Sequence, residues 1–600
     1  MITPTRIGSF ISLPELGEPK PTLREVIRIA KTINRTAGLT VLGQMNLFLS
    51  AAAIKEDLES DSDARWQAQE HLIRTTVSER RLRILKDSLF AAHLRDRIVF
   101  HRRQLLSAIK LVALFGESVR GNMLVSRDDF GVLTELALAI NSLSDFGSIP
   151  SGKIGARDLA AQLAPARELE NLPRIDNGLV RSRRMLGRIL TTKRHMPLAG
   201  ELEQLFVFLT RGFSFDAYRD MLFGIFSYFQ AAPMTSLDQF QQRAFLNPHA
   251  TDSPVAGRLF EQFLSHLAVD FHELPGTFGH IKDERTLLLD LTAFRMNPIW
   301  RFSPNSYLCV DPCLLVEKLA SGFYWTVNAA LDTDERRLQF SRLWGTLFED
   351  HVLEMLHHAV PSHRLTPNVM YNSPREEAFD AVVLEDTNAI VFEIKGSFAK
   401  TEAKYSGQFL RFFRGLSEKF GNQRHCAVQQ LATNVRHTFG LPRRRDISTL
   451  PVRQLRCVWP VVVFLEPILG FGLASGLLVD RFVHRIRKVV PQVYTSIRPV
   501  VFLSIEDIEI IVQNIREGDF TFVDCLREKL GYDQTNYLSF HDFYWGQFVP
   551  EHKVEFKRNT IIGNEYGELS EAAMTRFSAG VYSRCTHTEF GAVFRRMDQG

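Results

Sequence analysis

The segment Phe379–Gly396 constrains the fold of this chain more than any other stretch of its sequence. Two apolar runs rich in strand-forming residues flank Asp386 and Thr387, which have the composition of a tight turn. If these two residues form the centre of a hairpin connection, Leu384 pairs with Ala389, and the register of the flanking residues follows by counting outward. The segment therefore predicts an antiparallel β-hairpin of defined register.

Three charged side chains share one face of this predicted hairpin. In the same register, Asp380 lies directly opposite Glu393. Because side chains alternate between the two faces of a strand, Lys395 shares the face of Glu393, while Ile394 points the other way into a core. Carboxylates that face each other destabilise a sheet, and buried charges are costly unless they are paired or bind a cation. The pattern therefore predicts a functional site.

The chemistry of these groups predicts a magnesium site. Carboxylate oxygens without imidazole or thiolate ligands suit a hard ion such as Mg²⁺, for which Mn²⁺ can substitute. A metal-bound water beside a lysine is the chemistry required to hydrolyse a phosphodiester. The alternative is that Glu393 and Lys395 form a weak, solvated pair on an edge strand, which leaves Asp380 without an explanation.

These residues resemble the PD-(D/E)XK nuclease superfamily, whose signature is an acidic residue on one strand and E-x-K on the next strand of a hairpin. The resemblance implies that Asp380 and Glu393 hold the metal, and that Lys395 positions or activates the attacking water and stabilises the transition state. Phe379 stands where the family has proline, a departure that touches no ligand. The resemblance covers residues 340–510, less than a third of the chain.

Two flanking helices add to the resemblance. The sequence Gly345–Val352 is similar to the G-x-x-F-E-x-x-V helix of the family, which makes Glu349 the candidate upstream acid and a third metal ligand. The segment after the E-x-K strand contains Gln429–Leu431, similar to the glutamine-bearing helix of the family, and Gln430 is the candidate for a supporting polar contact.

The spacing of apolar residues along the sequence predicts the fold that surrounds the hairpin. Helical spacing of apolar residues dominates roughly the first 330 positions, and from Arg364 short alternating or apolar runs take over. Helices are expected at Phe340–His358 and near Arg424–Phe439. The expected strands are 364–371, 377–384, 389–396, 460–466 and 499–505.

From these elements we expect an α+β multidomain protein, since 600 residues exceed one ordinary domain. A mainly α-helical N-terminal region, 1–335, would precede a restriction-endonuclease-like α/β domain with a mixed central sheet, 336–515. Residues 516–600 would form a C-terminal extension. The longest apolar stretch, Trp459–Val479, is interrupted by a glutamate, prolines and glycines, so we expect a buried strand followed by a loop rather than a membrane span.

Partners and location follow from charge and cysteine usage. The net charge is only +4, so the placement of basic residues matters more than their sum. The run Arg443, Arg444 and Arg445 follows the predicted nuclease helix and is the candidate nucleic-acid contact. Six scattered cysteines and a polar N-terminal start favour a cytoplasmic protein with reduced thiols and no membrane association.

The sequence as a whole favours a Mg²⁺-dependent nuclease, with DNA as the favoured substrate. A role in phage defence or restriction rests on analogy alone. The rival hypothesis is a non-catalytic scaffold or nucleic-acid-binding protein that retains the nuclease fold. A third is a nuclease that depends on a partner or motor protein. Cutting both strands of a duplex would favour a homodimer.

Overall fold

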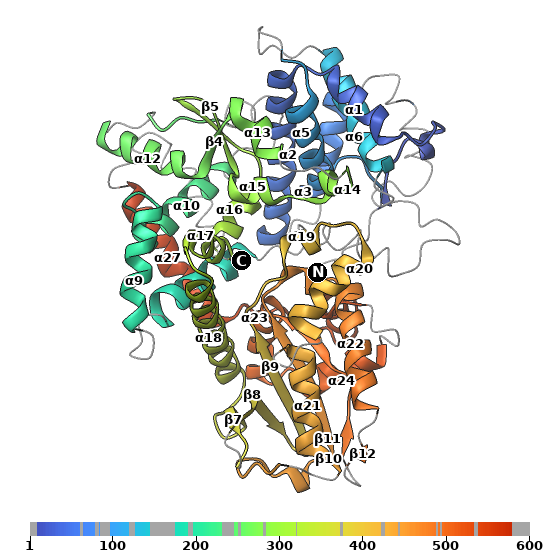
Figure 1. Ribbon diagram of the computed structural model, residues 1–600, viewed down its shortest axis with the longest axis vertical. Helices are drawn as coiled ribbons and strands as arrows, with labels where there is room; N and C mark the ends of the chain where they lie inside the picture. Colours follow the sequence, from blue (N-terminus) through green and yellow to red (C-terminus); the bar gives the residue numbers. More distant parts are fainter. Residues whose placement is uncertain are drawn as a thin grey trace. The chain divides into compact units, whose positions relative to one another are not determined.

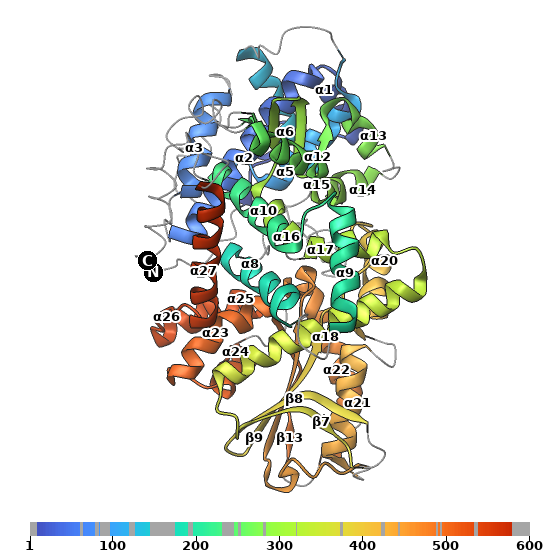
Figure 2. The same cartoon turned by 90° about the vertical axis from the view of Figure 1, so that its left-hand side faces the viewer.

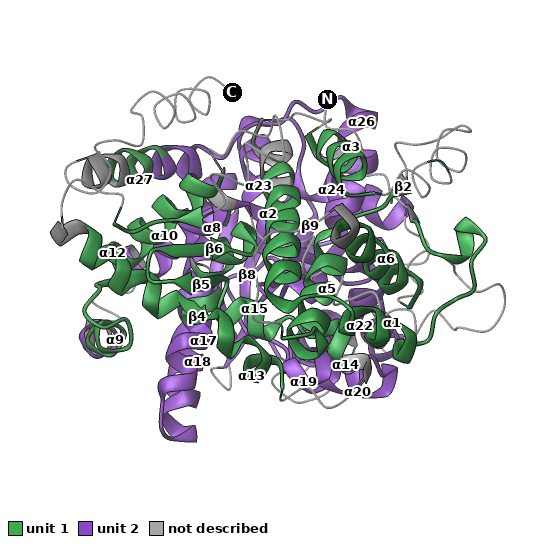
Figure 3. Cartoon of the chain, turned by 90° about the horizontal axis from the view of Figure 1, so that it is seen from above, with its two compact units in different colours: residues 1–154, 203–323, 567–600 green, residues 155–202, 324–566 purple. Residues whose placement is uncertain are grey.

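The computed structural model describes most of the chain, and two compact units can be distinguished in it (Figure 3). Unit 1 comprises Met1–Ile154, Glu203–Phe323 and Gly567–Gly600, and unit 2 comprises Gly155–Leu202 and Tyr324–Tyr566. The described residues are 9–59, 64–77, 83, 97–118, 127–143, 174–189, 196–230, 245–249, 254–279, 284–319, 321–372, 376–421, 426–441, 445–487, 490–491, 495–532 and 538–578.

Unit 1 is mainly helical and also contains a parallel pair, β1 and β2, and a sheet of four strands (Figure 1). The sheet has the order β3-β6-β5-β4, in which only β4 and β5 run parallel. The strands are β1 (Ser9–Phe10), β2 (Arg97–Ile98), β3 (Phe245–Leu246), β4 (Ala268–Asp270), β5 (Ile299–Ser303) and β6 (Ser306–Cys309). The helices are α1 (Leu23–Lys31), α2 (Arg35–Glu59), α3 (Ala64–Thr76), α5 (Arg102–Phe115), α6 (Arg127–Leu143), α10 (Phe215–Gln230), α12 (Pro254–Leu267), α13 (Leu274–Phe278), α14 (Glu284–Leu289), α15 (Thr292–Met296) and α16 (Pro312–Leu319). Helices α9 (Met196–Leu209), α17 (Ser321–Ala330) and α27 (Thr560–Ser578) extend across unit boundaries.

Unit 2 is built on a mixed sheet of six strands. Its order is β13-β11-β9-β8-β7, and β14 also pairs with β11. The pairs β7–β8 and β8–β9 are antiparallel, whereas β9, β13 and β14 run parallel to β11. The strands are β7 (Leu365–Met370), β8 (Glu377–Glu385), β9 (Asn388–Lys395), β11 (Cys457–Phe464), β13 (Ser496–Ile497) and β14 (Val501–Ser504), with β10 (Gly440–Leu441) and β12 (Val490–Pro491) forming a separate pair.

Helices cover both faces of this sheet. One face packs Val391 of β9 and Val462 of β11 into a core shared with α21 and α22, which lie beside the strands in Figure 1. On the other face, the ring of Phe392 contacts Phe522 of α24. The helices are α8 (Ile175–Arg183), α18 (Asp334–Ala359), α19 (Thr401–Lys404), α20 (Phe409–Leu416), α21 (Ala427–Phe439), α22 (Gly472–Ile486), α23 (Ile505–Glu517), α24 (Phe522–Tyr532), α25 (Phe540–Phe543) and α26 (Val549–His552), with π-helical turns η3 (Arg184–Ile189), η5 (Ser417–Gly421) and η8 (Tyr544–Phe548).

The five strands and two helices predicted in and around the hairpin are present, but the loop expected after the strand in Trp459–Val479 is largely a helix. Strand β11 ends at Phe464, and α22 begins at Gly472. Glycines at 472 and 476 disfavour a helix locally. Both are buried, as are Leu478 and Phe482, so packing against the core outweighs propensity.

A buried charge network fixes α18 on the rest of unit 2. The guanidinium of Arg181 in α8 donates to both carboxylate oxygens of Glu509 in α23, at 2.9 and 2.6 Å, and to Glu506 at 2.6 Å. His351 of α18 lies 2.9 Å from the same Glu509 carboxylate. Burial raises the pKa of Glu509, but Arg181 and His351 together lower it by more, so its net pKa lies below the ordinary value and the carboxylate stays charged.

Candidate functional site

The hairpin β8–β9 has the predicted register. Leu384 pairs with Ala389, and the ladder continues to Ala381 opposite Phe392. Asp386 occupies the left-handed region at φ 52°, a conformation that aspartate tolerates better than most residues and that a tight turn requires. The next step of the register places Asp380 opposite Glu393.

Asp380 is held by the neighbouring strand. Its side chain is only 4% exposed, and one carboxylate oxygen accepts a hydrogen bond of 2.5 Å from the backbone N–H of Ile394. Burial raises the pKa of Asp380, while Lys395 and this hydrogen bond act in the opposite direction. A cation beside Asp380 would therefore offset the cost of keeping it ionised.

Glu393 is fully buried, and its contact is an ion pair with Lys395. Apart from this pair, neither carboxylate oxygen of Glu393 has a hydrogen-bond partner among the described residues. Burial raises the pKa of Glu393 to about 8, although Lys395 lowers it. Burial lowers the pKa of Lys395, but Glu393 and Asp380 more than compensate, and the net pKa is raised. Lys395 is therefore a permanent cation between two carboxylates.

A β-bulge adds an acid that strand periodicity did not predict. Val369 pairs with Phe379, but the next residue, Met370, pairs with Glu377, so β8 has one extra residue at Ala378. The amide of Asn434 in α21 donates to the Ala378 carbonyl at 2.6 Å. Glu377 and Asp380 are three positions apart, which would place them on opposite faces of a regular strand. The bulge brings their carboxylates together.

Helix α18 supplies the fourth carboxylate, from Glu349. Thr333 begins this helix by accepting a hydrogen bond from the N–H of Arg336. Phe348 of α18 packs directly on Gly396, where a β-carbon would lie only 2.9 Å from the β-carbon of the phenylalanine. This close approach sets the adjacent Glu349 beside the carboxyl end of β9, and Glu349 contributes to the raised pKa of Lys395.

The assembled cluster can hold a cation. Single carboxylate oxygens of Glu349, Glu377 and Asp380 all lie within 4.8 Å of one another. The predicted ligand set was Asp380, Glu393 and Glu349. Glu377 is therefore an additional candidate, and Glu393 lies next to the group through its interaction with Asp380. Even with Glu393 protonated, the carboxylates of Glu349, Glu377 and Asp380 outnumber the single ammonium of Lys395, and a hard divalent ion would neutralise the excess.

The remaining predicted residues are less closely associated with the cluster. Gln430 is half-buried on α21, and its side chain forms no hydrogen bond with a described residue. Arg443 and Arg444 lie outside the described residues. Arg445 pairs with Glu376 at 2.7 Å, and its guanidinium lies 4.7 Å from the ring centre of Tyr371.

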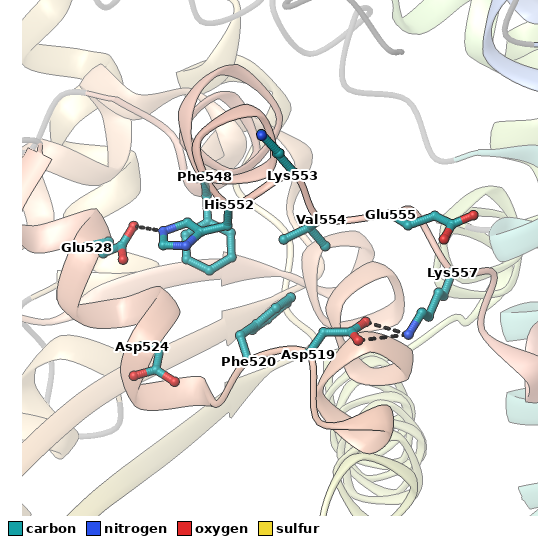
Figure 4. A pocket seen from close by; sticks show the side chains of 10 residues that line it. All are labelled: Asp519, Phe520, Asp524, Glu528, Phe548, His552, Lys553, Val554, Glu555 and Lys557. Atoms are coloured by element: carbon teal, nitrogen blue, oxygen red, sulfur yellow. Dashed lines mark hydrogen bonds and ion pairs between the residues drawn. The ribbon is translucent and has the colours of Figure 1, made fainter.

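A pocket elsewhere in unit 2 shares no residue with this cluster (Figure 4). It encloses about 520 Å³, and its floor includes the rings of Phe520 and Phe548. His552 and Glu528 face each other at its rim, 2.6 Å apart, and Lys557 pairs with Asp519 (Figure 4). Its charged side chains are thus largely paired with one another.

No family model, curated protein or solved structure matches this chain. Among the described residues, no helix combines the length and the apolar character needed to cross a membrane.

Proposed function

We propose that unit 2 is a restriction-endonuclease-like domain that hydrolyses phosphodiester bonds of nucleic acid with the help of Mg²⁺, for which Mn²⁺ can substitute. The observation that carries this proposal is the buried Glu393–Lys395 pair next to the three converging carboxylates of Glu349, Glu377 and Asp380. The sequence pattern of the hairpin and of α18 supports the same assignment.

The proposed roles follow from the position and charge of each group. Glu349, Glu377 and Asp380 would hold the metal, with Glu393 as a further ligand or as the group that orients Lys395. The metal, when bound, would lower the pKa of a water molecule and neutralise phosphate charge.

Lys395 would act as an electrostatic group rather than as a base. It is held beside two acids, and its raised pKa keeps it protonated at neutral pH. An ammonium fixed in a largely buried site stabilises negative charge that develops on phosphate oxygens, and it needs no reorganisation during the reaction.

DNA is the favoured substrate. The proposed biological role is phage defence or restriction, and the proposed location is inside the cell. Dependence on a partner or motor protein, and a homodimer that cuts both strands, are compatible extensions of this proposal.

The test is cleavage of labelled single- and double-stranded DNA and RNA with Mg²⁺ or Mn²⁺. The near-isosteric variants Asp380→Asn and Glu393→Gln, and Lys395→Ala, should each lose cleavage by about 10²-fold or more. Glu402→Gln, an exposed acid on α19, is the matched control and should cleave at the native rate.

Cleavage abolished by chelator and by all three site variants would support the proposal. A native protein that cleaves none of these substrates with either metal would refute the stand-alone enzyme. Equal cleavage by Glu393→Gln and the native protein would refute the assignment of the site.

A further inference from the structure

The helix that follows the candidate site presents aromatic and apolar side chains outward. In α20 the rings of Phe409 and Phe413 stack with centroids 5.4 Å apart and planes inclined by only 12°. Both rings are half-buried, and Leu410 between them is 75% exposed. Phe412 and Leu416 belong to the core, and Phe409 also packs partly against it. Leu410 and the exposed part of the two stacked rings therefore form the outward side of α20. Exposed apolar side chains gathered on one face of a helix indicate a binding surface.

Guanidinium groups surround these rings. Arg411 and Arg414 are exposed on α20, and Arg481 of the neighbouring α22 places its guanidinium carbon 4.3 Å from the centre of the Phe413 ring. Figures 1 and 2 both show α20 and α22 adjacent to each other. None of these three arginines forms an ion pair with a described acidic residue. Burial, followed by repulsion from Arg485, lowers the pKa of Arg481, so an anion at this place would relieve a real electrostatic cost.

The segments that contain α19, α20 and α22 are more basic than the chain as a whole. Residues 400–421 and 472–487 together contain eight lysine and arginine residues and three acidic ones. Their excess of five positive charges is larger than the net charge of the whole protein, which is +4. Basic charge is therefore concentrated here, as expected of a surface that meets a polyanion.

The rings of Phe409 and Phe413 and the arginines around them, here called the basic aromatic surface, are connected through α19 to the strand that bears Glu393 and Lys395. Glu466, just after β11, accepts a hydrogen bond of 2.6 Å from the N–H of Ala399 and pairs with Lys404 of α19 at 2.7 Å.

Helix α20 in turn packs tightly on α19. A β-carbon at Gly415 would lie 2.3 Å from that of Ala403, so only glycine permits this approach. The surface therefore has a fixed connection to the candidate site, and α20 begins 14 positions beyond Lys395.

We propose that Phe409, Phe413, Arg411, Arg414 and Arg481 form a binding surface for single-stranded nucleic acid. Bases stack on aromatic rings and guanidinium planes only when they are unpaired, whereas arginines hold the phosphates of any strand. This inference rests on the proposed function, because it assigns the strand that the nuclease site receives. Ribose and deoxyribose strands share the required chemistry, and the experiment separates them.

The test is fluorescence anisotropy of the full chain in chelator, which prevents cleavage. The probes are a single-stranded DNA of about 12 nucleotides, an RNA of the same sequence, the DNA duplex, and an abasic strand of equal length. The native protein should bind a single strand at least tenfold more tightly than the duplex and the abasic strand. DNA and RNA are compared to learn which sugar is preferred.

Two double variants separate the contribution of phosphate contacts from that of base stacking. Arg411→Gln/Arg414→Gln should reduce the dependence of log affinity on log salt concentration by about 1.4, because each phosphate contact on a single strand contributes about 0.7. Phe409→Leu/Phe413→Leu should weaken binding of the normal strand roughly tenfold or more and leave the abasic strand unaffected.

The control is Arg453→Gln/Arg456→Gln, which removes the same charge from exposed positions preceding β11 and should bind as the native protein does. Thermal unfolding of every variant checks that it folds.

The inference is overturned if the native protein binds no single strand, if duplex and abasic strands bind equally well, or if both double variants match the control. Its failure is distinguishable from failure of the proposed function. If Glu393→Gln loses cleavage while the surface variants bind normally, the proposed nuclease function stands and the proposed binding surface is wrong. If binding depends on the surface residues but no metal-dependent cleavage is found, the binding surface stands and the proposed nuclease function is wrong.

Discussion

The contact between Gly396 and Phe348 allows a quantitative prediction. In Gly396→Ala, the new β-carbon would lie 2.9 Å from Cβ of Phe348 and 3.1 and 3.2 Å from its Cγ and Cδ1. Carbon atoms in contact are about 3.5–4.0 Å apart, so α18 and β9 must separate by roughly 0.6 Å or more. Overpacking of this kind costs about 1–3 kcal/mol.

The same displacement would move Glu349, the residue after Phe348, away from the other carboxylates. Because a misplacement of about 1 Å can reduce catalysis about 10²-fold, cleavage should fall by about tenfold or more even where the variant is fully folded. The measurements are the free energy of unfolding in urea and the rate of metal-dependent cleavage at a temperature well below the unfolding transition.

Gly345 on the same helix offers a matched control. A β-carbon there meets no atom within 4 Å. Gly345→Ala should therefore stabilise α18, by about 0.5–1 kcal/mol, because alanine favours the helix interior. If Gly396→Ala were as stable as the native protein, or if both variants lost the same stability, the argument that this contact positions α18 would be refuted.

Three further predictions follow from the site and its supports. Glu377→Gln should weaken binding of Mn²⁺, measured by calorimetry, by about tenfold or more, whereas Glu402→Gln should not, and equal affinities would remove Glu377 from the ligand set. Asn434→Ala deprives the bulge carbonyl of its donor and should lower both stability, by about 1–3 kcal/mol, and Mn²⁺ affinity; unchanged Mn²⁺ affinity would show that Asn434 does not position Glu377. Arg181→Met leaves the buried Glu509 without its main partner and should cost about 3–5 kcal/mol in urea unfolding, and a loss below about 1 kcal/mol would contradict this account of the network.

The register of the hairpin could be predicted because two local rules agree there. Alternation of side chains fixes the faces of β8 and β9, and the turn at Asp386 fixes their pairing, so Leu384 meets Ala389 as expected. Glu349 could be located only through a family resemblance, since no local rule connects a residue on α18 with Asp380.

Other features depend on contacts that a single sequence does not display. Glu377 escaped prediction because the bulge at Ala378 breaks the alternation on which the reasoning relied. Helix α22 was taken for a loop because its glycines obscure a buried face. The stacked rings of Phe409 and Phe413 follow helical spacing, but their exposure becomes evident only when the core side of α20 is known.

The pairing of Arg181 with Glu509 also bears on how this protein can be made and dissected. The two residues are 328 positions apart, and both are buried within unit 2. During synthesis, 328 further positions must be added after Arg181 before its guanidinium can meet Glu509. A fragment cut at 336–515, the boundaries that the sequence alone suggests, would leave Glu509 and Glu506 without the guanidinium of Arg181. We expect that fragment to be recovered as aggregate, and any attempt to isolate unit 2 should retain residues 174–189 as part of it.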